Sequence, residues 1–132
     1  MAKTVRIGPN EWIEGDDNVA VFRLSGKLLK EHAEVLVPMI FAFQDAHPNA
    51  VLLVDLTKGE GLEPDARKLI IGGVNQRPYA VGFIRASFAT RALMGMMLNA
   101  SRLLGRGYPH NFVDSEGDGR AWAKSLGAYA TK

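Results

Sequence analysis

The sequence contains no cysteine, which excludes disulfide bonds, thiolate metal sites and cysteine nucleophiles. It also has no long hydrophobic run: the longest apolar stretch, residues 35–43, is far short of the roughly 20 residues that span a bilayer. The first twelve residues lack the apolar segment of a signal peptide. We therefore expect a cytoplasmic protein without a membrane span, and 132 residues suit one domain covering residues 1–132.

Acidic residues are missing from the long segment between Asp65 and Asp114. That segment holds seven lysines and arginines, whereas residues 10–65 hold eleven carboxylates against four basic side chains. The net charge of +2 therefore hides two oppositely charged halves. A basic surface attracts an anionic partner, and its candidate residues are Arg67, Lys68, Arg77, Arg85, Arg91, Arg102 and Arg106.

The usual sequence signatures of catalysis, metal binding and nucleic-acid binding are absent. His32, His47 and His110 are far apart, and no HExxH, GxSxG or glycine-rich phosphate loop accompanies them. The basic residues are too dispersed to predict a nucleic-acid partner, no cluster has metal-ligand spacing, and no cofactor is expected. We expect no enzyme; a small hydrolase is the third and weakest hypothesis, because it needs a histidine to meet a carboxylate in a concave site.

Turn-forming residues divide the chain into short β-like runs and longer helical runs. The first two strands are expected at residues 5–7 and 19–24, paired as a hairpin through an acidic turn at residues 14–18. Other strands are expected at residues 50–56, 79–86 and 111–113. Helices are expected at residues 28–46, 64–74, 90–104 and 117–126. This order, ββαβαβαβα, predicts a single α/β domain with a mixed, mostly parallel sheet packed by helices.

Local signals support several of these helix boundaries. Pro64 suits the first turn of the second helix, and Thr90 can cap the third. The Gly-Arg-Gly segment at residues 105–107 can end the third helix. The last helix is expected to cover one face of the sheet through its apolar side chains, Trp122, Ala123 and Leu126.

Several strings, in this order and spacing, resemble the STAS domain in its SpoIIAA-like, or STAS/Sec14-like, branch. They are Val-Phe-Arg-Leu-Ser-Gly at residues 21–26 before a helix with Glu31 and Pro38, Leu-Leu-Val-Asp-Leu at residues 52–56, and Arg-Ala-Trp at residues 120–122. The resemblance covers most of the chain and implies a non-enzymatic regulatory or protein-interaction module. The Sec14-like branch implies an alternative, a carrier or sensor of a small apolar or amphiphilic anionic ligand, as in lipid binding.

The resemblance also implies where a phosphorylation switch would lie. In STAS antagonists the phosphorylated Ser or Thr sits at the helix start after the Asp-Leu strand end. Here no Ser or Thr occurs between Thr57 and Ser87, so we expect no switching by phosphorylation at the usual position, and only Thr57 remains as an acceptor. Glu63 and Asp65 occupy that helix start, either as ordinary acids of a first turn or as a mimic of the phosphorylated state.

Asp55 and the residues after it form the first group of candidate binding residues. Asp55 ends a strand of a mostly parallel sheet, and ligands tend to gather at the carboxyl ends of such strands. We therefore predict a recognition surface at Asp55, Thr57, Lys58 and Glu60. The alternative is that Asp55 only accepts hydrogen bonds from nearby backbone amides.

The expected helix at residues 90–104 provides the second group. Its apolar residues form two stripes, one through Met96 and Met97 and one through Met94 and Leu98. Methionine is flexible and polarizable, so it suits a pocket or a partner groove. Either the helix offers a binding surface, or one stripe is core and the other a partly exposed edge.

Three arginines near this helix would suit the anionic head of an amphiphile, because guanidinium groups bind carboxylate and phosphate with paired hydrogen bonds. They are Arg85, Arg91 and Arg102. The first helix is also apolar all round at residues 35–43, which predicts burial on two sides against core, a second subunit or a ligand. A homodimer through the first or third helix is therefore expected as one form of self-association. A closed pocket under the methionine-rich helix would favour the carrier, and a flat exposed patch the interaction module.

Overall fold

The computed structural model describes residues 3–15, 18–47, 49–77, 79–103 and 110–126. Within these ranges the side chains of residues 75, 93 and 97–103 are not described. The expected helix end at residues 105–107 therefore lies outside the described residues, as do Asp16 and Asp17 of the expected acidic turn.

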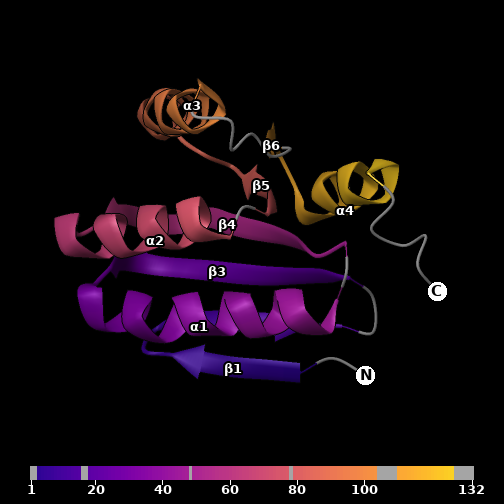
Figure 1. Cartoon of the computed structure of the whole chain (residues 1–132), viewed down its shortest axis with the longest axis horizontal. Helices are drawn as coiled ribbons and strands as arrows, with labels where there is room; N and C mark the ends of the chain where they lie inside the picture. The colour runs from indigo at the N-terminus through magenta and orange to yellow at the C-terminus, as the bar shows by residue number, and fades with distance from the viewer. Residues whose placement is uncertain (1–2, 16–17, 48, 78, 104–109, 127–132) are drawn as a thin grey trace.

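Six strands form one sheet in the order β1-β2-β3-β4-β5-β6 (Figure 1). The first three, β1 (Lys3–Ile7), β2 (Asn10–Glu14) and β3 (Val19–Leu28), are antiparallel neighbours. From β3 onward each pair is parallel, through β4 (Val51–Leu62), β5 (Ala80–Ile84) and β6 (His110–Val113). The prediction of an α/β fold with a mixed, mostly parallel sheet packed by helices is therefore confirmed.

Four helices pack on the two faces of this sheet: α1 (Lys30–Ala46), α2 (Pro64–Gln76), α3 (Phe88–Leu103) and α4 (Glu116–Ser125). Helices α1 and α2 lie side by side over the middle strands, and α3 lies beyond α2 (Figure 1). Alternate strand residues face opposite ways, so Leu52 packs in the core with α1 while Leu53 packs in the core with α4.

The predicted hairpin between residues 5–7 and 19–24 is wrong, because β2 lies between these two strands and pairs with both. Val5 is opposite Trp12, and Trp12 is opposite Phe22. Burial of alternate residues explains why this segment forms a strand: Asn10 and Trp12 are fully buried. The Asn10 side chain donates to Ile7 O and accepts from the backbone N–H of Ser25 at 2.8 Å, which fixes the turn against β3.

Other element boundaries move by a few residues. Strand β3 continues to Leu28, so α1 begins at Lys30, and β4 continues to Leu62 instead of ending at residue 56. Helix α3 begins before Thr90: the Ser87 hydroxyl accepts a hydrogen bond from the backbone N–H of Thr90 at 3.1 Å. Ser87 is therefore the residue that caps α3, and the prediction of Thr90 as the cap is wrong.

Helix α4 covers the second face of the sheet, as predicted, but with a smaller set of side chains. Ala123 is fully buried and Trp122 packs against the same core, whereas Leu126 is 39% exposed and does not cover the sheet. Close packing here requires a glycine on β5: a Cβ at Gly82 would lie 2.9 Å from Leu53 and 3.2 Å from Trp122.

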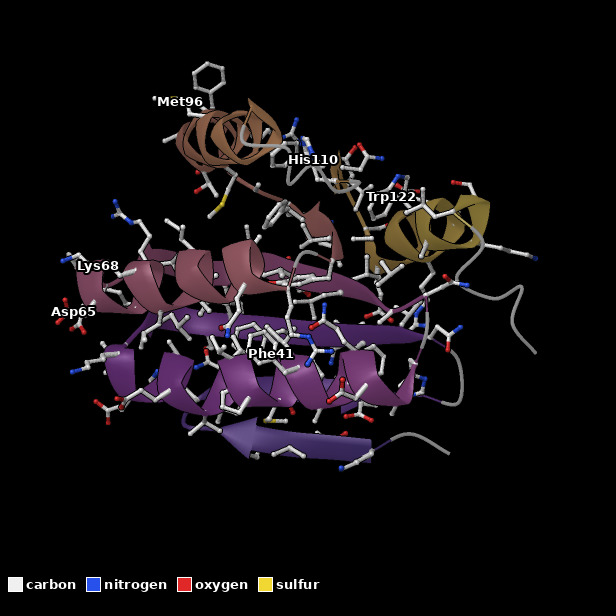
Figure 2. The ribbon with its side chains drawn as sticks, in the orientation of Figure 1. Phe41, Asp65, Lys68, Met96, His110 and Trp122 are labelled. Atoms are coloured by element: carbon white, nitrogen blue, oxygen red, sulfur yellow. The ribbon has the colours of Figure 1, made fainter. Side chains whose placement is uncertain are left out.

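Helix α1 packs one face against the core, and α2 covers part of a second side; burial of the remaining apolar surface against a second subunit or a ligand stays a prediction. The buried face of α1 consists of Ala33, Leu36, Ile40 and Phe43. On the outside Val35 is 49% exposed. The apolar excess is covered in part by α2, because Phe41 lies between the two helices and the Arg77 guanidinium lies 5.1 Å from its ring centroid (Figure 2).

Candidate functional site

An apolar cavity of about 380 Å³ lies between the sheet and the first three helices. Its floor is formed by strand residues, and its walls and roof come from α1, α2 and the start of α3. The strand residues include Phe22, Leu24, Leu52, Val54, Val81 and Phe83. The helix residues include Leu36, Ile40, Ile70, Ile71, Val74 and Met94.

The alternation of the strands explains the apolar floor. Leu52 is opposite Val81 and Val54 is opposite Phe83, so four apolar side chains of β4 and β5 share one face. The residues between them face α4 instead. The cavity remains because the helices cover this face without filling it, and its volume lies within the range of natural small-ligand pockets, roughly 300–1,000 Å³.

Polar side chains line the cavity near the carboxyl ends of β4 and β5. Asp55 and Ile84 form the last pair between β4 and β5. Thr57 follows within β4, and Arg85 directly follows β5. Ser87 and Thr90 at the start of α3, and Arg67 near the start of α2, complete this group. Among the described residues no aspartate or glutamate lines the cavity. We call these five residues the polar edge.

Arg67 is the most unusual member of the polar edge. Its backbone N–H makes an ordinary helical hydrogen bond to Glu63 O, but its side-chain Nε is buried without a hydrogen-bond partner. No carboxylate of the described residues forms an ion pair with it. A buried donor of a charged group that has no acceptor is costly, so this atom is a position where an acceptor would stabilise the protein.

Arg85 is held in a fixed position at the other side of the polar edge. Its φ of 57° lies in the left-handed region, which is uncommon for a residue with a Cβ. The backbone N–H of Arg85 donates to Val113 O at 2.9 Å, and its Nε donates to Asp114 O at 3.0 Å. These bonds to β6 and the residue after it compensate the strained backbone, which is typical of functional sites.

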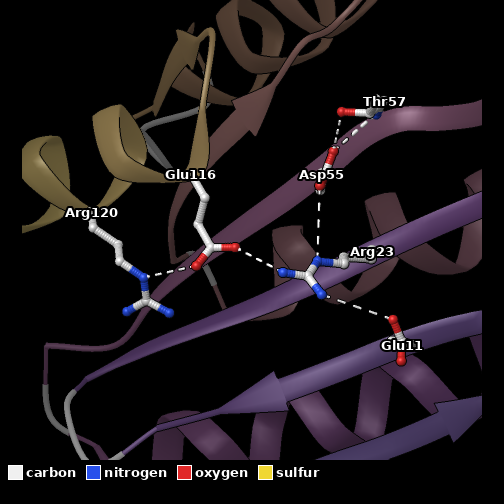
Figure 3. Close-up of polar contacts among 6 residues, drawn as sticks. All are labelled: Glu11, Arg23, Asp55, Thr57, Glu116 and Arg120. Atoms are coloured by element: carbon white, nitrogen blue, oxygen red, sulfur yellow. Dashed lines mark hydrogen bonds and ion pairs between the residues drawn. The ribbon is translucent and has the colours of Figure 1, made fainter.

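The predicted recognition surface at Asp55 is divided between two faces. Asp55 lies 4.0 Å from the Arg23 guanidinium, within a network that includes Glu11, Glu116 and Arg120 on the α4 side of the sheet (Figure 3). Thr57, in contrast, lines the cavity.

Lys58 and Glu60, further along β4, are exposed and do not line the cavity. The structure therefore brings only one of the four predicted residues to the cavity.

The methionine-rich helix, α3, has side chains both in the cavity and on the outer surface. Met94 lines the cavity, whereas Met96 is 72% exposed on the outer side of α3 (Figure 2). Phe88, at the start of the same helix, is 87% exposed. The side chains of three predicted binding residues in α3 lie outside the described part of the chain, namely Met97, Leu98 and Arg102.

Arg91 faces β6 and does not line the cavity. Its guanidinium lies 5.7 Å from the ring centroid of Phe112, and its Nε donates to Ala86 O at 3.3 Å. Of the two arginines in this group whose side chains are described, Arg85 is therefore the one that lines the cavity.

The histidines lie away from the cavity and make separate local contacts. His32 Nδ1 accepts from the backbone N–H of Leu29 at the start of α1. His47 Nδ1 lies 3.1 Å from Asn18 Oδ1, and His110 lies edge-on to Phe112. Within the described ranges no group of His, Asp and Glu side chains could hold a metal ion, and no described helix is long and apolar enough to cross a membrane.

Sequence reasoning missed Arg67, Ser87 and Thr90 as cavity residues. The signal for Arg67 is its spacing: it precedes Ile71 and Val74 by four and seven residues, so it belongs to an apolar helical stripe. A charged residue within such a stripe indicates a polar contact in the interior.

Comparison with known proteins identifies the fold. No family model matches the chain, and no curated protein matches its sequence. The anti-sigma factor antagonist SpoIIAA in its unphosphorylated form superposes with a TM-score of 0.63 at 13% identity, covering 87% of this chain and 97% of that one. An uncharacterised Shewanella loihica protein with a SpoIIAA-like fold gives 0.62 at 19% identity, covering 93% and 92%. A Thermotoga maritima protein assigned as an anti-sigma factor antagonist gives 0.58 at 11%, covering 86% and 92%.

Proposed function

We propose that the chain, which has the SpoIIAA-like, or STAS, fold that its sequence indicates, is a non-enzymatic STAS-like regulatory module whose cavity binds a small apolar or amphiphilic ligand. The cavity carries this proposal: about 380 Å³ of apolar space, partly open to solvent, lies against Met94 of the methionine-rich helix, where a flat interaction patch would leave no such space.

The chemistry of the cavity lining favours binding over catalysis. The residues of the polar edge are two arginines, two threonines and a serine. Thr57 donates to Asp55 at 2.6 Å, but among the described residues no acid or histidine lines the cavity itself. The Ser87 hydroxyl lies 2.9 Å from the Thr90 hydroxyl and caps α3, so its polar neighbours are those of a helix cap and not those of an activated nucleophile.

Mass spectrometry of freshly purified protein tests this proposal directly. Native spectra should show a mass excess that is lost on denaturation and traceable to an extractable apolar molecule. Protein stripped of that molecule should bind the neutral fluorescent probe N-phenyl-1-naphthylamine at a single saturable site. An apo mass together with no saturable probe binding would overturn the cavity as a ligand site.

A second candidate function is docking of a protein partner, or of a second copy, on the outer side of α3. The observation in favour is the exposure of two large apolar side chains, Phe88 at 87% and Met96 at 72%. SpoIIAA, which shares the fold, is an anti-sigma factor antagonist, so a protein partner fits that comparison. The subunit count in the native spectra tests self-association, since a dimer that separates on changing Phe88 and Met96 to serine would support it.

A further inference from the structure

We infer that the ligand is a single-chain amphiphile with a carboxylate head, such as a medium-chain fatty acid, and that Arg67 binds the head. This inference rests on the proposed function, because it takes the cavity to be the ligand site. It adds the chemical class of the ligand and the residue that recognises it.

Charge inside the cavity provides the first step. A guanidinium stays protonated at any physiological pH, so Arg67 and Arg85 bring two positive charges to the lining. Within the described part of the chain no acidic residue lines the cavity to balance them. An anion supplied by the ligand is the complement to such a lining, since a partly buried charge without a counter-charge is unfavourable.

The hydrogen bonds of the two arginines distinguish their roles. The Nε of Arg85 already donates to Asp114 O at 3.0 Å, so that side of its guanidinium is occupied. The Nε of Arg67 is buried and has no acceptor. A carboxylate can accept two parallel hydrogen bonds from the Nε and Nη of one guanidinium, so it satisfies the vacant donor and balances one charge.

The position of Arg67 on α2 sets the direction of the ligand's alkyl chain. Ile70, Ile71 and Val74 line the cavity further along the same helix. At 1.5 Å per residue, the distance along α2 from Arg67 to Val74 is about 10 Å, which suits a medium-length alkyl chain. The head would therefore lie near the start of α2 and the chain would run towards Val74 over the apolar strand residues.

The test compares decanoate with decanol by isothermal titration of stripped protein at pH 8, where the carboxylate is ionised. The wild type should bind decanoate about tenfold more tightly than decanol, or better, because a charge-assisted hydrogen bond adds to the same apolar contact. Arg67→Met should remove this preference while decanol still binds. Lys68→Met makes the same change of charge at the next residue, which is exposed at the outer end of α2 (Figure 2), and should bind as the wild type does.

A conservative variant completes the design, and circular dichroism checks that each variant is folded. Arg67→Lys keeps the charge but loses the paired donors, so it should retain part of the preference for decanoate. Equal binding of the two ligands by the folded wild type, or an unchanged preference in Arg67→Met, would overturn the assignment of the head while leaving the cavity as an apolar site. Failure of the wild type to bind either ligand would instead overturn the proposed function on which the inference rests.

Discussion

The Thr57 hydroxyl donates a 2.6 Å hydrogen bond to Asp55 Oδ1, and the backbone N–H of Thr57 donates to the same oxygen at 3.0 Å. The one threonine near the usual phosphorylation position of STAS antagonists is therefore bound to a carboxylate, which would repel a phosphate. That this chain is not switched by phosphorylation at that position stays a prediction.

Replacing Thr57 tests this relationship. Thr57→Val removes only the hydroxyl bond and should lower the free energy of unfolding by about 0.5–1 kcal/mol, since the site is exposed. Thr57→Glu should cost more, because it places a second carboxylate beside Asp55. Urea denaturation measures both, with Thr4→Glu on the exposed outer strand as the control. A Thr57→Glu variant as stable as the wild type would show that the site accepts negative charge.

The ion pair between Arg77 and Asp45 connects α2 to α1 at 2.6 Å. Because both side chains are partly exposed, a double-mutant cycle with Arg77→Met and Asp45→Asn should give a coupling energy of about 0.5–1 kcal/mol. The coupling should fall in 1 M salt, where charges are screened within about 3 Å. A coupling energy that does not change with salt would contradict an electrostatic origin.

Asn10 should be the most sensitive polar residue of the antiparallel strands. Its side chain is fully buried and satisfies both Ile7 O and the Ser25 N–H. Asn10→Ala should lower the free energy of unfolding by about 2 kcal/mol, because it leaves two backbone groups without partners. Asn49→Ala, at an exposed position, should change it by less than about 0.5 kcal/mol in the same urea titration. Similar losses in the two variants would mean that the buried bonds contribute little.

Filling the cavity should block ligand binding without unfolding the protein. Val74 lines the cavity, so Val74→Phe places a ring in space that a ligand would occupy. We expect at least a tenfold loss of N-phenyl-1-naphthylamine affinity, with thermal stability unchanged or higher, because cavity filling commonly stabilises. Val35→Phe makes the same substitution at a position on α1 that is 49% exposed, and it should leave probe binding unchanged. Equal affinities of the two variants would place the probe elsewhere.

Much of the fold could be predicted from the sequence because its signals are local. The apolar run at residues 51–54 is that of a strand buried on both faces, and Pro64 starts α2 where its fixed φ suits a helix. The strand at residues 10–14 was missed because its polar first residue and two glutamates conceal the alternation. Only burial of Asn10 and Trp12 between β1 and β3 shows it.

The candidate site was less predictable, because its residues come together only through crossover connections. Thr57, Arg67 and Thr90 belong to β4, α2 and α3, and Arg85 directly follows β5. The parallel arrangement of β4 and β5 brings these four residues to one edge of a cavity. Arg91 has the same charge and lies near them in sequence, yet it faces Phe112.

By itself, the sequence determined the alternation of strands and helices, the α/β class and the separation of charge along the chain. It also determined that enough apolar residues are present to cover two sheet faces. These properties depend on residue type and short-range spacing. The tertiary structure decided which apolar residues pack closely and which surround the cavity, and that Arg67 has a buried donor without an acceptor. A cavity is the space left between elements, so it depends on how helices separated in sequence rest on the sheet, which no local pattern encodes.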